Sequence, residues 1–201
     1  MLSETSQFLE LLRPEYNDAL KYCKALCAKR SIDDAEDVLQ QSLLKSLENF
    51  DRLNDRSKFR SWFFKIITRE FFNSVRKDFW RKFIPLDNAM QVPEMPEVFD
   101  RLENDNNKII LSRALSRISS KERSAILLFE IGGFSIEEIR DIQNEKSTSA
   151  IKSRLSRARE KLRKIITNEE GNISNKKNKN SIIIGDLHNE TVSLIHGTEG
   201  K

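Results

Sequence analysis

The segment "SIEEIRDIQNEKSTSAIKSRLSRAREKLR", residues 135–163, contains the patterns of two helices separated by a polar turn. Its opening "SIEE" matches the capping box, in which a serine and an acid three residues later satisfy each other's backbone groups. It predicts a short helix that ends near Gln143. After the turn "NEKST", apolar residues recur at spacings of 4, 3, 4 and 3, so one face of a longer helix carries Ile151, Leu155, Ala158, Leu162 and Ile165. A short helix, a polar turn and a long basic helix form the helix-turn-helix pattern, with the second helix in the recognition position.

The second helix is strongly basic, with seven cations and one acid, Glu160, in residues 149–166. Such a helix can be a core helix with a solvated charged face, or it can bind nucleic acid, a membrane or a partner helix. Its apolar seam spans about two heptads, fewer than the three or four that indicate a coiled coil. It also has no Trp or Phe of the kind common in interfacial helices. The helix alone does not decide among these partners.

The composition predicts an all-α protein with one ordinary domain or two small ones. The chain has 201 residues, of which 38% are hydrophobic and 33% are charged, and its net charge is +4. Since this charge is modest, its concentration in one helix matters more than its total. No apolar run approaches the roughly 18 to 20 residues that span a bilayer, so no direct membrane insertion is expected. Two cysteines and no signal peptide indicate a cytoplasmic protein.

Motifs for catalysis are absent from the sequence. It has no glycine-rich phosphate loop and no nucleophile motif, so we expect no enzyme activity, no cofactor and no small-molecule substrate. Cys23 and Cys27 share one helical face, where packing is the favoured role. A zinc site would have to join them to His188 and His196 at the opposite end of the chain, so no metal is expected.

Two changes of composition divide the chain into four parts. Residues 84–105 hold three of the four prolines and six acids against one arginine, which predicts a flexible, extended linker. From residue 168 the sequence is polar and low in complexity, and two later β-like runs are too short for an independent sheet. We therefore predict helical domains at 1–83 and 106–167, a linker at 84–105 and a disordered tail at 168–201.

The first domain has three helical patterns, at about residues 8–27, 32–48 and 59–82, with Pro14 expected to end or restart the early turns of the first. The third pattern carries eight aromatic residues interleaved with cations: Phe59, Trp62, Phe63, Phe64, Phe71, Phe72, Phe79 and Trp80. Exposed aromatics beside cations hold unpaired nucleic-acid bases, whereas buried ones form the core of a bundle. Both interpretations remain open on the sequence.

Two long segments carry a resemblance. "DAEDVLQQSLLKSLENFDRLNDRSKFRSWFFKIITREFFNSVRK", residues 34–77, resembles region 2 of the extracytoplasmic-function (ECF) sigma factors of bacterial RNA polymerase. "ALSRISSKERSAILLFEIGGFSIEEIRDIQNEKSTSAIKSRLSRAREKLR", residues 114–163, resembles region 4 of the same family. The resemblance implies a sigma-70 family factor that binds core RNA polymerase and directs it to specific promoters. The alternative, a stand-alone helix-turn-helix regulator, leaves the first domain without a role.

The resemblance also implies three sets of site residues. The residues implied to bind the β′ clamp helices of the polymerase are Asp34, Asp37, Leu39, Gln40, Gln41 and Leu44. The residues implied to melt and read the downstream promoter element are Asn54, Asp55, Arg56, Ser57, Lys58, Phe64, Lys65 and Arg69. The residues implied to bind the upstream element are Thr148, Ser149, Lys152, Ser153, Arg154, Ser156 and Arg157.

The resemblance further implies that the second domain binds the β flap and that an anti-sigma factor, often membrane-bound, holds the protein inactive. The chain departs from the family pattern at the turn before the recognition helix, which is one residue longer and has Asn144 at the customary glycine. Asparagine tolerates the left-handed backbone conformation that a tight turn needs, so we expect the turn to form.

Overall fold

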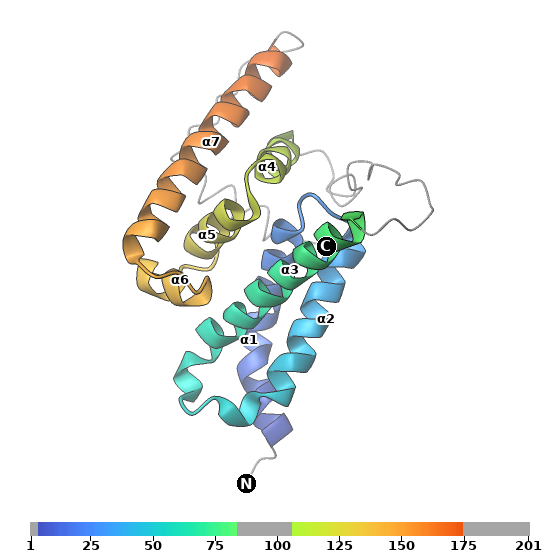
Figure 1. Ribbon diagram of the computed structural model, residues 1–201, viewed down its shortest axis with the longest axis vertical. Helices are drawn as coiled ribbons and strands as arrows, with labels where there is room; N and C mark the ends of the chain where they lie inside the picture. The colour runs from blue at the N-terminus through green and yellow to red at the C-terminus, as the bar shows by residue number, and fades with distance from the viewer. Residues whose placement is uncertain (1–3, 84–105, 175–201) are drawn as a thin grey trace, which may run out of the picture.

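The computed structural model describes residues 4–83 and 106–174, and these form two helical bodies (Figure 1). The first body contains α1 (Glu4–Leu26), α2 (Ile32–Glu48) and α3 (Phe59–Phe83), which lie side by side. Two 3-10 turns, η1 (Phe50–Arg52) and η2 (Arg56–Lys58), connect α2 to α3. The second body contains α4 (Asn106–Arg117), α5 (Ser120–Glu130), α6 (Ile136–Ile142) and α7 (Thr148–Ser174). The all-helical prediction is confirmed.

Three helices begin at capping boxes, and one of these is the predicted box at Ser135. In each box a serine Oγ accepts from the backbone N–H three residues later, and the acid at that position accepts from the serine N–H. The boxes are Ser31–Asp34 at α2, Ser119–Glu122 at α5 and Ser135–Glu138 at α6. A serine cap of this kind stabilises a helix by about 1 kcal/mol.

Helix α1 is continuous through Pro14, so the predicted break there is wrong. Proline removes one helical hydrogen bond. The residues on both sides of it, Phe8, Leu12 and Ala19, are all buried in the same core, and this packing offsets the loss.

Helix α7 packs against α4, α5 and α6 through the predicted seam. Ile151, Leu155, Ala158 and Leu162 are at most 3% exposed. Ile166 is also buried, whereas Ile165, the last residue of the predicted seam, is half-buried. The helix also continues to Ser174, seven residues past the predicted boundary at 167. The predicted linker, 84–105, and the tail from residue 175 lie outside the described residues.

The turn before α7 forms as expected. Asn144 has a positive φ of 52°, so it adopts the left-handed conformation that the customary glycine would supply. Gly133, at the turn before α6, also has a positive φ, 63°.

The two bodies pack against each other, with α1 on α5 and α3 on α6. The Tyr22 hydroxyl lies 2.8 Å from Ser124 Oγ in the other body and 2.9 Å from Thr68 Oγ1 in its own. The Phe64 ring meets Phe134 with ring centroids 5.1 Å apart. The buried residues of both bodies therefore form one continuous cluster.

Candidate nucleic-acid and partner interfaces

The outward face of α7 carries most of the residues expected to contact the upstream element. Ser149, Lys152, Ser153, Ser156 and Arg157 are exposed, and Thr148 is half-buried at the start of the helix. Spacings of three and four place these residues opposite the buried seam. Within residues 4–83 and 106–174, no carboxylate pairs with Lys152 or Arg157. Both charges are available to an external anion.

Arg154 differs from its neighbours. It is 9% exposed, its guanidinium bonds to Gln143 Oε1, and its Nη2 lies 2.5 Å from Glu145 Oε1. These contacts close the turn between α6 and α7, and the hydrogen bond from Arg154 lowers the pKa of the Glu145 carboxyl. Arg154 therefore bonds within the turn in this structure, and its expected contact with DNA stays a prediction.

The later cations of α7 form ion pairs with acids of the second body. Arg159 pairs with Glu130 of α5 at 2.8 Å, and Lys161 pairs with Glu122 of α5 at 2.7 Å. Glu160, the single acid of the segment, pairs with Arg163 and Lys164 on the same helix. The charge of the basic helix therefore divides into an outward group near its start and a structural group further along.

On α2, the residues expected to dock on a partner fall into two groups. Asp37, Gln40, Gln41 and Leu44 are exposed, and their spacing makes one continuous strip. Leu39 is 3% exposed and belongs to the core, and its expected direct contact with a partner stays a prediction. Val38, Ser42 and Ser46, one residue before Leu39 and three and seven residues after it, are buried with it.

Two details refine the docking strip. Asp34, at the start of this strip, is half-buried. Its carboxylate completes the cap of α2 and forms an ion pair with Arg30 at 2.9 Å. Leu47, three residues after Leu44, is 43% exposed and extends the strip. An exposed leucine at this spacing was a signal that the sequence reasoning missed.

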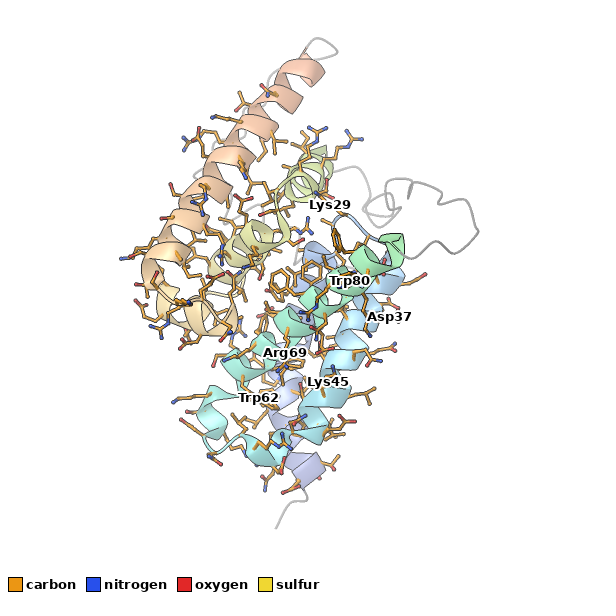
Figure 2. All side chains as sticks on the ribbon, viewed as in Figure 1. Lys29, Asp37, Lys45, Trp62, Arg69 and Trp80 are labelled. Atoms are coloured by element: carbon orange, nitrogen blue, oxygen red, sulfur yellow. The ribbon has the colours of Figure 1, made fainter. Side chains whose placement is uncertain are left out.

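A groove runs between α2 and α3 beside this strip. Its lining includes Asp37 and Gln41 from α2 and Asn73 and Lys77 from α3, and Lys45 closes one part through a 2.6 Å ion pair with Glu70. Figure 2 shows Asp37 and Lys45 along α2, next to α3. Both helices therefore contribute acids and cations to the lining of the groove.

The loop between α2 and α3 presents most of the residues expected at the downstream element. Asn54, Asp55, Ser57 and Lys58 are exposed. Asp55 caps η2 by accepting from Ser57 N and Oγ at 3.0 and 2.6 Å, and these bonds lower the pKa of its carboxyl. Arg56 is half-buried, with its guanidinium carbon 3.7 Å from the centre of the Phe50 ring and Nη1 donating to Phe50 O. Arg56 therefore braces the loop.

Phe64, expected to help capture a base, is 1% exposed. It contacts Tyr22 and Phe134, with ring centroids 5.3 and 5.1 Å away. Lys65 and Arg69, on the opposite side of α3, are exposed. In the packed arrangement, Lys65 and Arg69 are open to a ligand and Phe64 is not.

Arg60 braces this contact between the bodies. It pairs with Glu15 and, at 3.2 Å, with Asp18, and its Nη2 donates to Gly132 O of the second body at 3.1 Å. Its guanidinium carbon lies over the Phe64 and Phe134 rings at 5.3 and 5.4 Å. Arg60 thus contacts both sides of the interface.

The two cysteines lie in the core of the first body. Cys23 and Cys27 are free and buried, and burial raises the pKa of the Cys27 thiol to about 12. No group of three or more metal-ligating side chains occurs in the two bodies as described. Among the same residues, no helix has the length and apolar character needed to cross a bilayer.

A two-body helical chain whose second body presents a basic helix-turn-helix has the architecture of a DNA-binding transcription protein. Two family models match it: "Sigma-70 region 2" over residues 11–81 and "Sigma-70, region 4" over residues 108–162. The ECF RNA polymerase sigma factor EcfG of Rhodopseudomonas palustris is 30% identical over 140 residues, which are 69% of this chain and 74% of EcfG. The RNA polymerase sigma factor SigV of Bacillus subtilis is 29% identical over 150 residues, which are 74% and 86% of the two chains.

Solved structures show the same fold. The sigma factor RpoE of Bartonella quintana, in complex with the anti-sigma factor NepR, matches with a TM-score of 0.62 at 27% identity, over 83% of this chain and 98% of RpoE. CnrH, solved with the cytosolic domain of CnrY, matches in fold with a TM-score of 0.54 at 19% identity, over 80% and 87%.

The chain belongs to the sigma-70 family, as an ECF sigma factor with regions 2 and 4. It works with core RNA polymerase and promoter DNA, directs initiation at specific promoters, and has no enzymatic activity of its own. The family membership confirms the resemblance seen in the sequence.

Proposed function

We propose that the outward face of α7 reads the upstream promoter element through Lys152 and Arg157, helped by Ser149, Ser153 and Ser156. The observation that supports this is the division of the α7 cations. These two are exposed without a described carboxylate partner, while Arg154, Arg159 and Lys161 are held by acids of the same body. A recognition helix needs uncommitted cations for phosphates and base edges.

A double variant tests this role. Lys152→Ala/Arg157→Ala should weaken promoter binding by the holoenzyme and leave the binding of core polymerase unchanged. If each cation contacts one phosphate, the slope of log affinity against log salt should fall by about 1.8. The matched control is Arg163→Ala/Lys164→Ala, which removes two exposed cations further along α7. An equal loss in both variants would mean that only the overall charge of the helix matters.

We propose that Asp37, Gln40, Gln41 and Leu44 dock on the β′ clamp helices of core polymerase. They form the exposed strip of α2, while Leu39 supports it from the core and Asp34 fixes its start. Asp37→Ala/Leu44→Ala should abolish retention on immobilised core polymerase without lowering the melting temperature. Glu10→Ala, an exposed acid on α1, is the control, and a double variant retained as well as the wild type would refute the assignment.

We propose that the loop at 54–58, with Lys65 and Arg69, melts and reads the downstream element. Phe64 joins them when the two bodies separate, because it is buried between them in the packed arrangement. Arg123 of α5 favours separation of the two bodies. It lies beside Phe71 of α3, is 2% exposed, and its Nε has no hydrogen-bond partner among the described residues. Burial also lowers its pKa to about 10. A buried cation with an incomplete set of bonds destabilises the packed form.

We propose that the protein works in the cytoplasm, that its second body also contacts the β flap, and that an anti-sigma factor controls it. RpoE was solved with the anti-sigma factor NepR.

The domain limits 1–83, 84–105 and 106–167 remain our proposal, with α7 extending the last unit to Ser174. Run-off transcription with purified core enzyme on genomic fragments tests the whole assignment and identifies the promoter. A chain that core polymerase does not retain would favour a stand-alone regulator.

A further inference from the structure

The turn after α1 meets the second body. Cys27 directly follows the last residue of α1, and two backbone bonds hold it there, from Cys27 N to Cys23 O and from Arg30 N to Cys27 O. Its side chain is 1% exposed. Tyr22, five residues earlier, bonds to Ser124 of α5, and α1 and α5 are in contact. The turn therefore faces the start of α5.

Arg123, the residue before Ser124, is the part of α5 that acts on this turn. Burial and the nearby charge of Arg123 lower the pKa of the Lys29 ammonium. Burial raises the pKa of the Cys27 thiol to about 12, and the charges of Arg30 and Arg123 oppose this only in part. Figure 2 shows Lys29 on the turn, beside the second body. The thiol is thus buried among cations that come from both bodies.

Arg123 is poorly satisfied at this place. It is 2% exposed, and its Nη1 donates to Leu115 O at 3.0 Å. Its Nε has no hydrogen-bond partner, and no carboxylate pairs with it within residues 4–83 and 106–174. A buried cation with an incomplete set of bonds is costly, and Lys29 adds a like charge. Separation of the bodies returns Arg123 to water, so this corner favours opening of the contact.

The two cysteines of the chain differ in their relation to the second body. Cys23 is 0% exposed and belongs to α1 itself, and burial followed by the neighbouring Cys27 raises the pKa of its thiol. The Cys27 thiol also responds to the charge of Arg123, which belongs to the second body. Cys27 therefore borders the contact between the bodies, whereas Cys23 lies inside the first body.

We propose that Cys27 is a modification site for small disulfides, closed while the two bodies are packed and open when they separate. After separation, the Cys27 thiol gives its proton to solvent and its sulfur attacks one sulfur of the disulfide. A new S–S bond forms as the old one breaks, and the other half leaves as a thiolate. Arg30 stays beside Cys27 in the open form and favours the thiolate, which is the reacting species.

The modification has a consequence for the packing of the bodies. The group bound to Cys27 takes the space that the start of α5 occupies in the packed arrangement, because Cys27 is almost fully buried there. A modified chain therefore stays open until a thiol reductant removes the group. This inference rests on the separation of the bodies that we propose for Phe64.

Labelling of full-length single-cysteine chains tests the site. Cys23→Ala leaves Cys27 as the one thiol, and Cys27→Ala leaves Cys23 as the matched control. Reaction with dithiobis(nitrobenzoate), itself a small disulfide, should be faster at Cys27 and change little at low urea concentrations, because separation exposes less surface than unfolding. Reaction at Cys23 should be slower and rise steeply with urea. Equal rates with equal urea dependence would mean that only unfolding exposes Cys27 and would overturn the proposal.

A variant that weakens the contact gives the second arm. Arg60→Ala removes the bond to Gly132 O of the second body and should speed the labelling of Cys27 about 10-fold or more relative to Cys23. The control is Lys45→Ala, which removes an ion pair within the first body and should leave this ratio unchanged. An Arg60→Ala chain with the ratio of the parent chains would overturn the proposal.

Small-angle scattering measures the consequence. The radius of gyration of the Cys23→Ala chain should rise on modification and return to its starting value with dithiothreitol. A modified chain with an unchanged radius would overturn the proposal. An Arg60→Ala chain that is expanded but whose Cys27 does not react would also overturn it, while the proposed separation of the bodies would stand.

Discussion

Replacing Tyr22 with phenylalanine probes the contact between the two bodies with the removal of one oxygen atom. The Tyr22 ring is 1% exposed, and its hydroxyl meets Ser124 Oγ at 2.8 Å and Thr68 Oγ1 at 2.9 Å. Thr68 keeps a partner in the variant, because its Oγ1 also donates to Phe64 O at 2.7 Å. Ser124 is 0% exposed, and within the described residues the Tyr22 hydroxyl is its one side-chain partner. The variant therefore leaves a buried hydroxyl unsatisfied.

The expected cost is about 1 to 3 kcal/mol, the penalty for one buried polar group without a partner. For a chain of this length, each kcal/mol lowers the melting temperature by about 2 to 4 °C. Ser124→Ala should cost less, because Tyr22 keeps its bond to Thr68. Tyr22→Phe/Ser124→Ala should be more stable than Tyr22→Phe, since it replaces both partners with apolar groups.

Thermal unfolding followed by circular dichroism or calorimetry measures all three variants. Tyr16→Phe is the control, because Tyr16 is on the same helix and is 41% exposed. The hydrogen-bond assignment is wrong if Tyr22→Phe unfolds at the temperature of the wild type. It is also wrong if the double variant is no more stable than Tyr22→Phe.

Three further predictions concern single residues. Arg154→Ala should lower the free energy of unfolding by about 1 to 3 kcal/mol in urea titrations because it opens the turn before α7, while Lys152→Ala should change it by less than about 0.5 kcal/mol. Leu39→Ala should cost about 2 to 5 kcal/mol by the same measurement, whereas Leu44→Ala should leave stability nearly unchanged and weaken retention on polymerase. Burial raises the pKa of the Cys27 thiol from 9.0 to about 12, so its contribution to stability is complete below pH 9.0 and falls as the pH rises towards 12. Cys27→Ala should flatten this decline in alkaline thermal melts, and an unchanged slope would contradict it.

Much of the site was readable from the sequence because its signals are local. The capping boxes at Ser31, Ser119 and Ser135 each involve residues three apart, and all three form. Asp37, Gln40 and Leu44 were expected from the family resemblance, and helical spacing places them on one exposed face. Helical spacing also places Leu39 on the same face as Ala35 and Ser42, which are buried with it.

The sequence by itself determined the helices, their starts, the seam of α7 and the family, since each depends on residue spacing along the chain. The tertiary structure alone decided which cations and aromatics are available. It committed Arg154 to Glu145, buried Phe64 against Phe134, and left Trp80 exposed. Tyr22 and Ser124 are 102 positions apart, so no local pattern indicates their bond. The physical reason is that a helical period fixes which residues share a face, whereas packing between elements fixes which faces meet water.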